Sequence, residues 1–363
     1  MYPFREGCFA VRNGWYVAGF VEELGRKLLA RTILGQPVVM YRKEDGAAVA
    51  VGGRCPHRHF PLGESCLKGD AIECGYHGIT FGPDGQCVKV PSQSHVPRSY
   101  RIPTYPLVEH GIWAWIWMGD PDRADPALLP DLEEIGATGQ DLVLRPFYTE
   151  HVKGRYQLLN DNLLDLTHLG YLHASSIGTE DNASAPEELT KEPGVLRSRR
   201  YIRDAVPPPV VAQFNGEDIE RIDRVVGMDF YLPGFHAGIS DVKVAESNPV
   251  RRGEVLTRGR VYHAVTPETP TTCHYFFALS ARTEAEVDRM FPYLQPVIAE
   301  DKFAAEEIER MLAIIGENPD ELLIKSDRNA VEGRRMLQAM MDAEANESPP
   351  AGRSRPVGEM AHQ

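Results

Sequence analysis

The chain has 363 residues, of which 42% are hydrophobic and 25% are charged, and its formal net charge is −13 at pH 7. This length suits two domains, and the composition is typical of a globular protein. The negative charge argues against nucleic acid or an anionic membrane surface as a partner. The sequence contains neither an apolar run near the ~20 residues of a membrane span nor an N-terminal signal-peptide core.

Six cysteines are present, and four of them are scattered: Cys8, Cys66, Cys87 and Cys273. We expect these four to be free, buried thiols rather than disulfide partners, which suits the reducing cytoplasm. The sequence therefore predicts a cytoplasmic protein.

Residues 1–120 contain short alternating apolar runs broken by glycine and proline, which predict the strands of a small all-β domain. One run, from Trp113 to Trp117, places tryptophan at every second position. Because side chains alternate along a strand, this period favours a strand with its tryptophans on one face over an aromatic cage.

Two mixed pairs of cysteine and histidine lie in this region: Cys55 with His57, and Cys74 with His77. Two thiolates on one iron and two imidazoles on the other hold a Rieske-type [2Fe–2S] cluster. The alternatives are a structural zinc site, a disulfide between the two cysteines, and chance clustering. Zinc sites usually pair like with like, and a disulfide would leave both histidines unexplained. The spacing therefore favours the cluster.

Residues 121–145 are acidic and contain proline, which predicts a linker between domains. The stretch from Gln157 to His173 has no proline and has leucines at helical intervals, so we expect a buried helix. Polar residues on such a helix need a partner or a ligand. Two imidazoles, from His168 and His173, and one carboxylate would make the facial triad of non-haem Fe(II) oxygenases. The alternative is a core histidine satisfied by Asp165.

Beyond this helix, residues 195–285 have a strand-like sequence pattern, whereas residues 283–315 and 330–345 have the pattern of amphipathic helices. We expect an α+β catalytic domain over residues 121–345, in which helices cover a curved antiparallel sheet. Residues 346–363 lack apolar residues to bury and are expected to form a disordered tail.

The two motifs, in this order, resemble the oxygenase component of a Rieske non-haem iron oxygenase. The segments RCPHRHFPLG, ECGYHGITF and DNLLDLTHLGYLH are similar to the branch of vanillate O-demethylase and dicamba monooxygenase. The resemblance covers residues 1–345. It implies an N-terminal all-β Rieske [2Fe–2S] domain over residues 1–120, and a [2Fe–2S] cluster and a mononuclear Fe(II) as cofactors.

The third iron ligand must come from elsewhere, and we choose Asp301. It stands where the family places its ligating aspartate, and we expect it to open a helix. The glutamines expected in the next two turns are replaced by residues such as Ile308 and Glu309, which is a departure from the family. Competing ligands are Glu300, Glu306 and Glu307, and an ordinary acidic helix N-terminus is the other interpretation.

The resemblance also implies how the two metals exchange electrons. In the family a carboxylate bridges a mononuclear-site histidine and a cluster histidine of the neighbouring subunit in a cyclic trimer. Here Asp165 would link His168 to His77 of the next protomer of a homotrimer, and its alternative role is to orient His168 alone. Asp161 and Asn162 are expected to support the ligands rather than bind iron.

The chain lacks a Gly-x-Gly-x-x-Gly fingerprint, so electrons must come from a separate reductase or ferredoxin. The resemblance implies that O2 hydroxylates a small aromatic substrate, by O- or N-demethylation or by methyl hydroxylation. Pocket residues are expected from residues 229–275 and 285–295. His263 and His236 are the polar candidates, and the aromatic ones are Phe235, Tyr262, Phe276 and Phe277.

Two other functions compete with a monooxygenase or demethylase. One is a different Rieske oxygenase reaction, such as ring dihydroxylation or oxidation of an alicyclic substrate, although dihydroxylating subunits are usually longer. The other is a Rieske electron carrier, which would need roughly a hundred residues and neither His168 nor His173.

Overall fold

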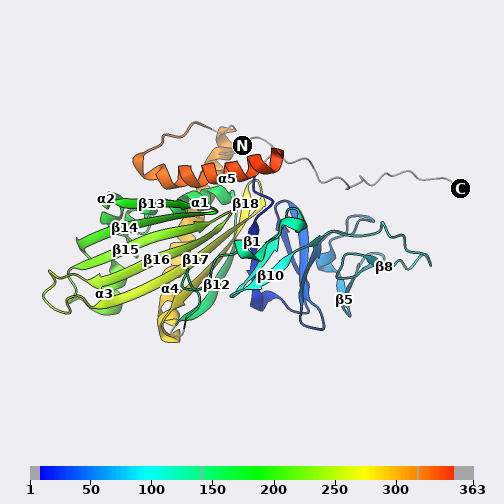
Figure 1. The fold of residues 1–363 in the computed structure, drawn as a ribbon, viewed down its shortest axis with the longest axis horizontal. Coiled ribbons are helices and arrows are strands. Elements are labelled where there is room, and N and C mark those ends of the chain that lie inside the picture. Colours follow the sequence, from blue (N-terminus) through cyan, green and yellow to red (C-terminus); the bar gives the residue numbers. More distant parts are fainter. Residues whose placement is uncertain (1–8, 140–141, 317–318, 347–363) are drawn as a thin grey trace.

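The computed structural model describes residues 9–139, 142–316 and 319–346. Cys8 and residues 347–363 of the predicted tail lie outside the described residues, while Asn346 ends the last helix. Figure 1 shows a smaller β region beside a larger α+β region. Among the described helices, none is long and apolar enough to cross a membrane.

The N-terminal region is built from small antiparallel sheets, as expected for an all-β domain. The first sheet has the order β1-β11-β10 and contains Trp15–Phe20, Trp113–Trp117 and Leu107–His110. The second has the order β2-β3-β4-β9 and contains Leu29–Ile33, Gln36–Arg42, Ala48–Gly52 and Thr104–Tyr105. The third has the order β5-β6-β7-β8 and contains Cys66–Lys68, Ala71–Glu73, Thr80–Phe81 and Cys87–Lys89. Short 3-10 helices η1 (Val21–Glu23) and η2 (Leu62–Glu64) connect these strands.

The tryptophan run forms strand β11, and all five of its residues are buried. Its three tryptophans belong to one core cluster, whereas Ala114 and Ile116 belong to another on the opposite face. The prediction of a strand with its tryptophans on one face is confirmed. The predicted linker that follows contains 3-10 helices η3 (Pro121–Arg123) and η4 (Pro126–Leu128). It also packs Ile135 and Ala137 into the tryptophan cluster, so it is anchored rather than free.

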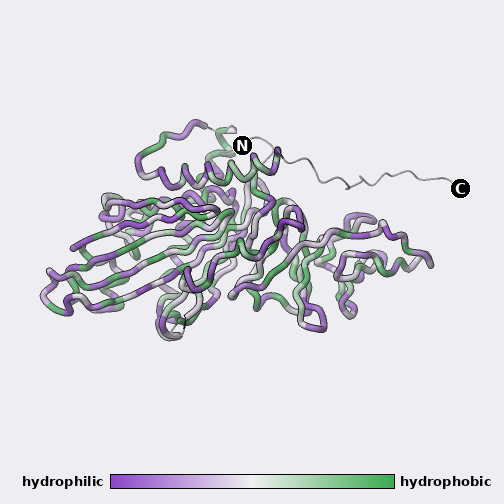
Figure 2. The backbone as a smooth tube through the Cα atoms, in the orientation of Figure 1, coloured by the Kyte–Doolittle hydropathy of each residue, from purple (hydrophilic) through white to green (hydrophobic). Residues whose placement is uncertain are grey.

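The larger region is organised by one seven-stranded antiparallel sheet in the order β12-β18-β17-β16-β15-β14-β13. These strands are Val143–Val152, Thr272–Ala281, Val255–Thr269, Phe235–Val244, Ile222–Tyr231, Val195–Ala205 and Glu187–Glu192. Buried and partly exposed residues alternate along most of β14, and hydrophobic and hydrophilic segments interleave along the strands in Figure 2. This alternation buries one face of the strand against the helices.

The helices complete the α+β architecture, which is the predicted one. They are α1 (Tyr156–Leu164), α2 (Asp181–Ser184), α3 (Pro209–Asn215), α4 (Glu284–Ile315) and α5 (Arg328–Asn346), with 3-10 helices η5 (Leu166–Gly170) and η6 (Lys325–Asp327). Helix α1 packs between the sheet and the two long helices α4 and α5. The two predicted amphipathic helices correspond to α4 and α5.

Two helix predictions need correction. The single helix expected from Gln157 to His173 ends at Leu164, because Asp165 adopts an extended conformation and its carboxylate accepts a hydrogen bond from Thr167 N at 2.9 Å. Aspartate favours such caps over helix interiors. Asp301 does not open a helix but lies inside α4, which continues through Pro292 and Pro296.

The two regions are joined by hydrogen bonds as well as by the chain. Thr266 of β17 donates its hydroxyl to Val17 O at 2.7 Å, and Leu34 N donates to Pro267 O at 2.9 Å. Because β17 reaches from the large sheet to the small region, it fixes the orientation of one region relative to the other within the chain.

Candidate functional site

Two loops present the Cys-His pairs, one between β4 and η2 and one between β6 and β7, and the two loops have the same hydrogen-bond pattern. Cys55 N donates to Phe60 O at 2.9 Å, and Cys74 N donates to Ile79 O at 2.8 Å. The carbonyl of each cysteine accepts from the amide four residues later, that of His59 or Gly78. These two residues share the left-handed conformation, with φ of 61° and 70°. The repeated turn therefore places two Cys-His pairs in matching positions.

The thiols point inward and the imidazoles point outward. Cys55 and Cys74 are 1% and 2% exposed, whereas His57 and His77 are exposed and their ring centroids lie 4.7 Å apart. Burial and the neighbouring Cys74 thiol raise the pKa of Cys55, so cluster assembly must displace a proton from this thiol. Two thiols facing two imidazoles is the donor set that a Rieske cluster requires.

The cysteines distinguish among the alternatives left open by the sequence. Cys55 and Cys74 are both free, so the structure contains no disulfide between them. The expectation of free thiols holds for Cys87 and Cys273, which are buried. Cys66 is free as well, but it is exposed rather than buried, because it begins the edge strand β5.

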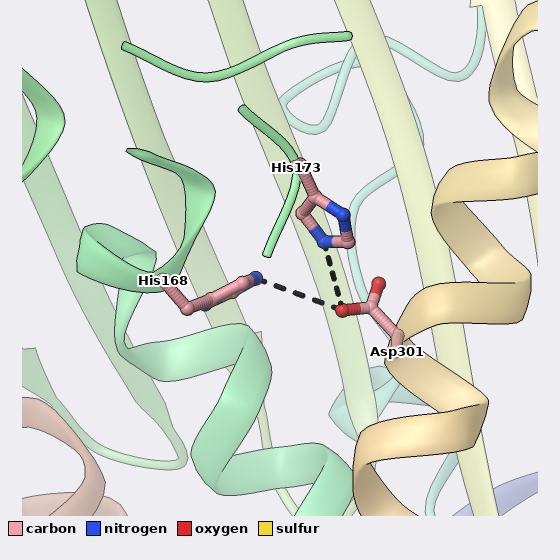
Figure 3. Close-up of side chains that lie close together, drawn as sticks. All are labelled: His168, His173 and Asp301. Atoms are coloured by element: carbon pink, nitrogen blue, oxygen red, sulfur yellow. Dashed lines mark hydrogen bonds and ion pairs between the residues drawn. The ribbon is translucent and has the colours of Figure 1, made fainter. Parts of the chain in front are cut away.

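A second group of side chains that could hold a metal ion, the candidate metal-binding group, lies between the large sheet and α4. His168, His173 and Asp301 each offer a ligand atom, and these atoms lie within 4.8 Å of one another. His173 Nε2 lies 3.0 Å and His168 Nε2 lies 3.6 Å from the same Oδ1 of Asp301. Figure 3 shows both imidazole nitrogens pointing toward that carboxylate oxygen. Two imidazoles and one carboxylate converging on one point fit a facial-triad iron site.

Each ligand comes from a different local structure. His168 lies in η5, which exists because the chain leaves α1 at Asp165. His173 follows in the turn after η5 and is fully buried. Asp301 is in the middle of α4 and is 4% exposed. The break in the predicted helix is therefore what turns His168 and His173 toward a common partner on α4.

The second nitrogen of each histidine is also engaged. His168 Nδ1 donates to the backbone carbonyl of Asp165 at 2.5 Å, and His173 Nδ1 donates to the Glu300 carboxylate at 2.6 Å. Each bond fixes the tautomer that leaves the Nε2 lone pair for a metal. Asn162 Nδ2 donates to Asp301 Oδ1 at 3.1 Å, which places its amide beside the carboxylate.

Local charge affects the two histidines in opposite ways. Burial lowers the pKa of His168, and this effect exceeds the stabilisation of its charged form by Asp301. Burial also acts on His173, but its hydrogen bonds to the carboxylates of Asp301 and Glu300, together with their negative charges, outweigh burial and raise its pKa. Glu300 is thus a hydrogen-bond partner of His173, whereas from the sequence we considered it only as a competing ligand. Its position next to Asp301 in the sequence is the feature that could have indicated this role.

Two other predicted residues have different surroundings from those expected. Asp161 does not approach the metal-binding group, since its carboxylate pairs with Arg334 of α5 at 2.5 Å and accepts from Gln157 Nε2 at 2.7 Å. It ties α1 to α5. The Asp165 carboxylate caps η5, and only its backbone carbonyl bonds to His168.

A cavity of about 410 Å³ opens onto the metal-binding group, whose three residues line it. His263 and Phe277 also line it, and its other walls are mostly apolar side chains from strands β15 to β18, α3 and α4. His263 Nδ1 and the Tyr275 hydroxyl lie 2.5 Å apart. Burial lowers the pKa of His263 to about 4, so its imidazole is neutral at pH 7.

His236 was expected in the pocket, and this expectation is corrected. It is fully buried away from the cavity lining, with Nε2 2.9 Å from Asn160 Oδ1 and its ring stacked on Phe230. The cavity is lined farther along β16, by Gly238, Ile239, Ser240 and Val242, whereas His236 lies against Asn160 of α1. Three predicted aromatic walls lie instead in the tryptophan cluster: Phe235, Tyr262 and Phe276.

Comparisons with known proteins agree with this geometry. A model described as the vanillate O-demethylase oxygenase C-terminal domain matches residues 152–343, and the Rieske [2Fe–2S] domain model matches residues 14–106. The chain is 32% identical to the oxygenase component of dicamba O-demethylase from Stenotrophomonas maltophilia, over 92% of this chain and 99% of the relative. It is 31% identical to a vanillate O-demethylase oxygenase subunit from Pseudomonas sp., over 92% and 95%.

The fold is similar to solved structures as well. The crystal structure of dicamba monooxygenase bound to dicamba matches with a TM-score of 0.81 and 31% identity, covering 94% of this chain and all of that one. A structure of dicamba monooxygenase with non-haem iron matches with a TM-score of 0.77. The similarity therefore extends over both regions of the chain.

Proposed function

Because this chain belongs to the Rieske oxygenases of the vanillate O-demethylase branch, we propose that its two sets of metal-binding residues serve one reaction: O2-dependent demethylation or methyl hydroxylation of a small aromatic compound. The chain is the oxygenase component of such a system. The observation that carries the proposal is the mostly apolar cavity lined by His168, His173 and Asp301.

We assign Cys55, His57, Cys74 and His77 to the [2Fe–2S] cluster, which supplies single electrons when bound. Their matching loops hold the two thiols inside and the two imidazoles at the surface. A separate reductase or ferredoxin in the cytoplasm is the proposed donor. We place the boundary between the Rieske and catalytic domains near residue 120.

We assign His168, His173 and Asp301 to a mononuclear Fe(II), which activates O2 when bound. The protein keeps both histidines in the ligand tautomer through Asp165 O and Glu300. The apolar wall excludes water from the reacting carbon. Neutral His263, held by Tyr275, is the polar group available to orient a substrate hydroxyl or carboxylate.

Within one chain the two sets of ligands are far apart. Figure 1 shows β5 and β8 at one end of the molecule and α1 and α4 in the other region. This separation supports a homotrimer in which the cluster of one subunit lies beside the iron of the next. Asp165 is only partly buried in the isolated chain. A residue that contacts His77 of a neighbouring subunit must be accessible in this way.

The bridging role of Asp165 has a direct test. Asp165→Asn preserves the cap on η5 and the backbone carbonyl, so both metals should remain bound. We expect the rate of electron transfer between the metals in a single turnover to fall by at least tenfold. A rate equal to that of the wild type would leave Asp165 with the role of shaping η5 alone.

The proposed reaction is tested with purified protein, a surrogate reductase and a panel of methoxy-aromatics, by measuring oxygen uptake and formaldehyde release. A hydroxylated O-methyl group is an unstable hemiacetal that leaves as formaldehyde and exposes a phenol. Formaldehyde in proportion to the oxygen consumed supports demethylation. A cis-diol product would instead assign the chain to ring dihydroxylation.

A further inference from the structure

The cavity contains a buried cation that the reaction described above does not use. Arg224 of β15 is 6% exposed and lines the cavity. Its Nη1 donates to Ile177 O at 3.0 Å, which is the one hydrogen bond that its guanidinium makes to the described residues. Its Nε is buried without a hydrogen-bond partner there. Five N–H groups are therefore served by a single acceptor.

Arg224 also lacks a carboxylate partner within the described part of the chain. Buried Arg200, on the neighbouring strand, pairs with Glu187 at 3.1 Å, and Arg155 pairs with Glu309 at 2.6 Å. For Arg224 burial alone lowers the pKa, to about 10, with no opposing charge nearby. A desolvated cation without an anion is costly, and proteins seldom keep one without a purpose.

Two other carboxylates that line the cavity are already engaged. Glu254 pairs with Arg251 at 2.7 Å, and Glu286 lies 3.5 Å from Arg282. The cross-strand neighbours of Arg224 are the apolar Ile202 and Val242. Among the residues that the structure describes, no unpaired carboxylate therefore faces Arg224, and this side chain lines the cavity.

A purely structural role explains only part of this arrangement. Arg224 holds the carbonyl of Ile177, and Ile177 N donates to His173 O at 3.2 Å, so the contact steadies the segment that carries a metal ligand. A neutral donor such as glutamine would make the same bond without burying a charge. The charge itself remains to be explained.

We propose that Arg224 binds an oxyanion group of the substrate, so that the cavity selects an aromatic carboxylate or sulfonate. This inference deepens the proposed function and rests on it, since the anion would be fixed at one end of the cavity and the oxidisable carbon at the metal-binding end. A planar guanidinium matches the geometry of both oxyanions. Arg224 is then a specificity-determining residue that touches the substrate.

The test measures binding separately from turnover. The probes are 4-methoxybenzoate, 4-methoxycinnamate and 4-methoxybenzenesulfonate, each compared with its neutral amide by calorimetric titration of the oxidised holoenzyme. A charge-assisted hydrogen bond predicts that at least one acid binds roughly ten- to a hundredfold more tightly than its amide. The carboxylate and sulfonate arms show which oxyanion the site prefers.

Substitutions then identify the residue responsible. Arg224→Gln keeps a donor for Ile177 O and should reduce the preference for acid over amide to less than about threefold. Arg224→Lys keeps the charge but loses the planar guanidinium, so it should retain only part of the preference. The control is Arg203→Gln, which removes an exposed arginine of the neighbouring strand that pairs with Asp223 at 3.3 Å. This control should keep the wild-type preference.

Two results would overturn the inference: a wild-type protein that binds no acid more tightly than its amide, or an Arg224→Gln variant that keeps the preference. Formaldehyde release is scored separately. Acid-selective binding without formaldehyde would contradict the proposed reaction and leave the anion site standing. Turnover of a neutral methoxy-aromatic that is unchanged by Arg224→Gln, without acid-selective binding, would support the proposed reaction and contradict the anion site.

Discussion

At the scale of single residues, the two histidines that we propose as iron ligands are each oriented by the partner of their second nitrogen. His168 bonds to a backbone carbonyl and His173 bonds to Glu300. The backbone partner cannot be removed by substitution, whereas the carboxylate partner can. Asp301 is the point on which both Nε2 atoms converge, so it is the residue whose loss should affect the site most selectively.

Replacing Asp301 by alanine should abolish binding of the mononuclear iron and leave the cluster intact. The side chain is 4% exposed and far along the chain from the cluster loops, so its removal does not disturb Cys55 or Cys74. The measurement is iron content together with the visible absorption of the cluster. Full retention of the mononuclear iron in this variant would move the third ligand to another carboxylate.

The neutral state of His263 predicts how stability depends on pH. Its pKa is about 4 in the folded protein and about 6.5 in the unfolded chain. A depressed pKa contributes stability above pH 6.5 that is lost as the pH falls toward 4. At pH 5 the loss from this residue is about 2 kcal/mol. Between pH 7 and pH 5, urea denaturation should therefore show a smaller loss in the free energy of unfolding for His263→Gln than for the wild type. Equal losses in the two proteins would contradict a buried, neutral His263.

At the scale of elements, the position of α4 relative to α1 decides whether the ligands meet. Glu309 of α4 is 7% exposed and accepts hydrogen bonds from Arg155 Nε at 2.6 Å and Arg155 Nη2 at 2.7 Å, just before α1 begins. It also accepts from Arg155 N at 3.1 Å. Glu309, which stands among the positions where the family resemblance led us to expect glutamines, thus forms a buried ion pair with Arg155 that joins the two helices.

Substituting Glu309 by glutamine should destabilise the protein by about 3 kcal/mol, because it removes the negative charge from a buried carboxylate that accepts three hydrogen bonds from Arg155. The matched control is Glu307→Gln, two residues away, which breaks an exposed pair with Arg310 and should cost less than about 1 kcal/mol. Chemical denaturation of the two variants measures the difference. Similar stabilities would show that the buried pair does not hold α4 against α1.

The elements also show how far the sequence could be used to predict the site. Cys55 with His57 and His168 with His173 are close in sequence, so the cluster motif and the histidine pair, taken together, predicted two sets of ligands. The break at Asp165 was missed, because a leucine pattern that continues through an aspartate does not show that its carboxylate will cap the next turn. The Asp161–Arg334 pair joins residues 173 positions apart, and no local pattern contains it.

Isolated residues were the hardest to predict. Asp301 was identified through the family resemblance, and its place inside a long helix was hidden by Pro292 and Pro296, which usually end helices. Arg224 carries no motif, since its significance comes from the absence of a carboxylate around it within the described residues. Such an absence becomes visible only when the strands are assembled.

At the scale of the whole molecule, the separation of the two ligand sets within one chain makes a prediction about mixed oligomers. His77→Ala should lack a functional cluster, and Asp301→Ala should lack the mononuclear iron, so each alone should be inactive. Coexpressed chains should regain part of the activity, because an intact cluster of one chain would then lie beside an intact iron of another. The measurement is substrate-dependent oxygen uptake by the purified mixture.

Complete inactivity of the mixture, with both chains shown to be present in the same oligomer, would contradict transfer between subunits. The wild-type oligomer provides the control for assembly. Three chains of 40.5 kDa each predict a particle of about 120 kDa by light scattering.

The most direct test of two cooperating metal centres is the ratio of iron to acid-labile sulfide in anaerobically purified protein. We expect about three iron atoms and about two sulfides per chain, two of the irons in the cluster and one at His168, His173 and Asp301. Zinc in place of iron, or equal amounts of iron and sulfide after incubation with Fe(II), would contradict the presence of two iron centres in one chain.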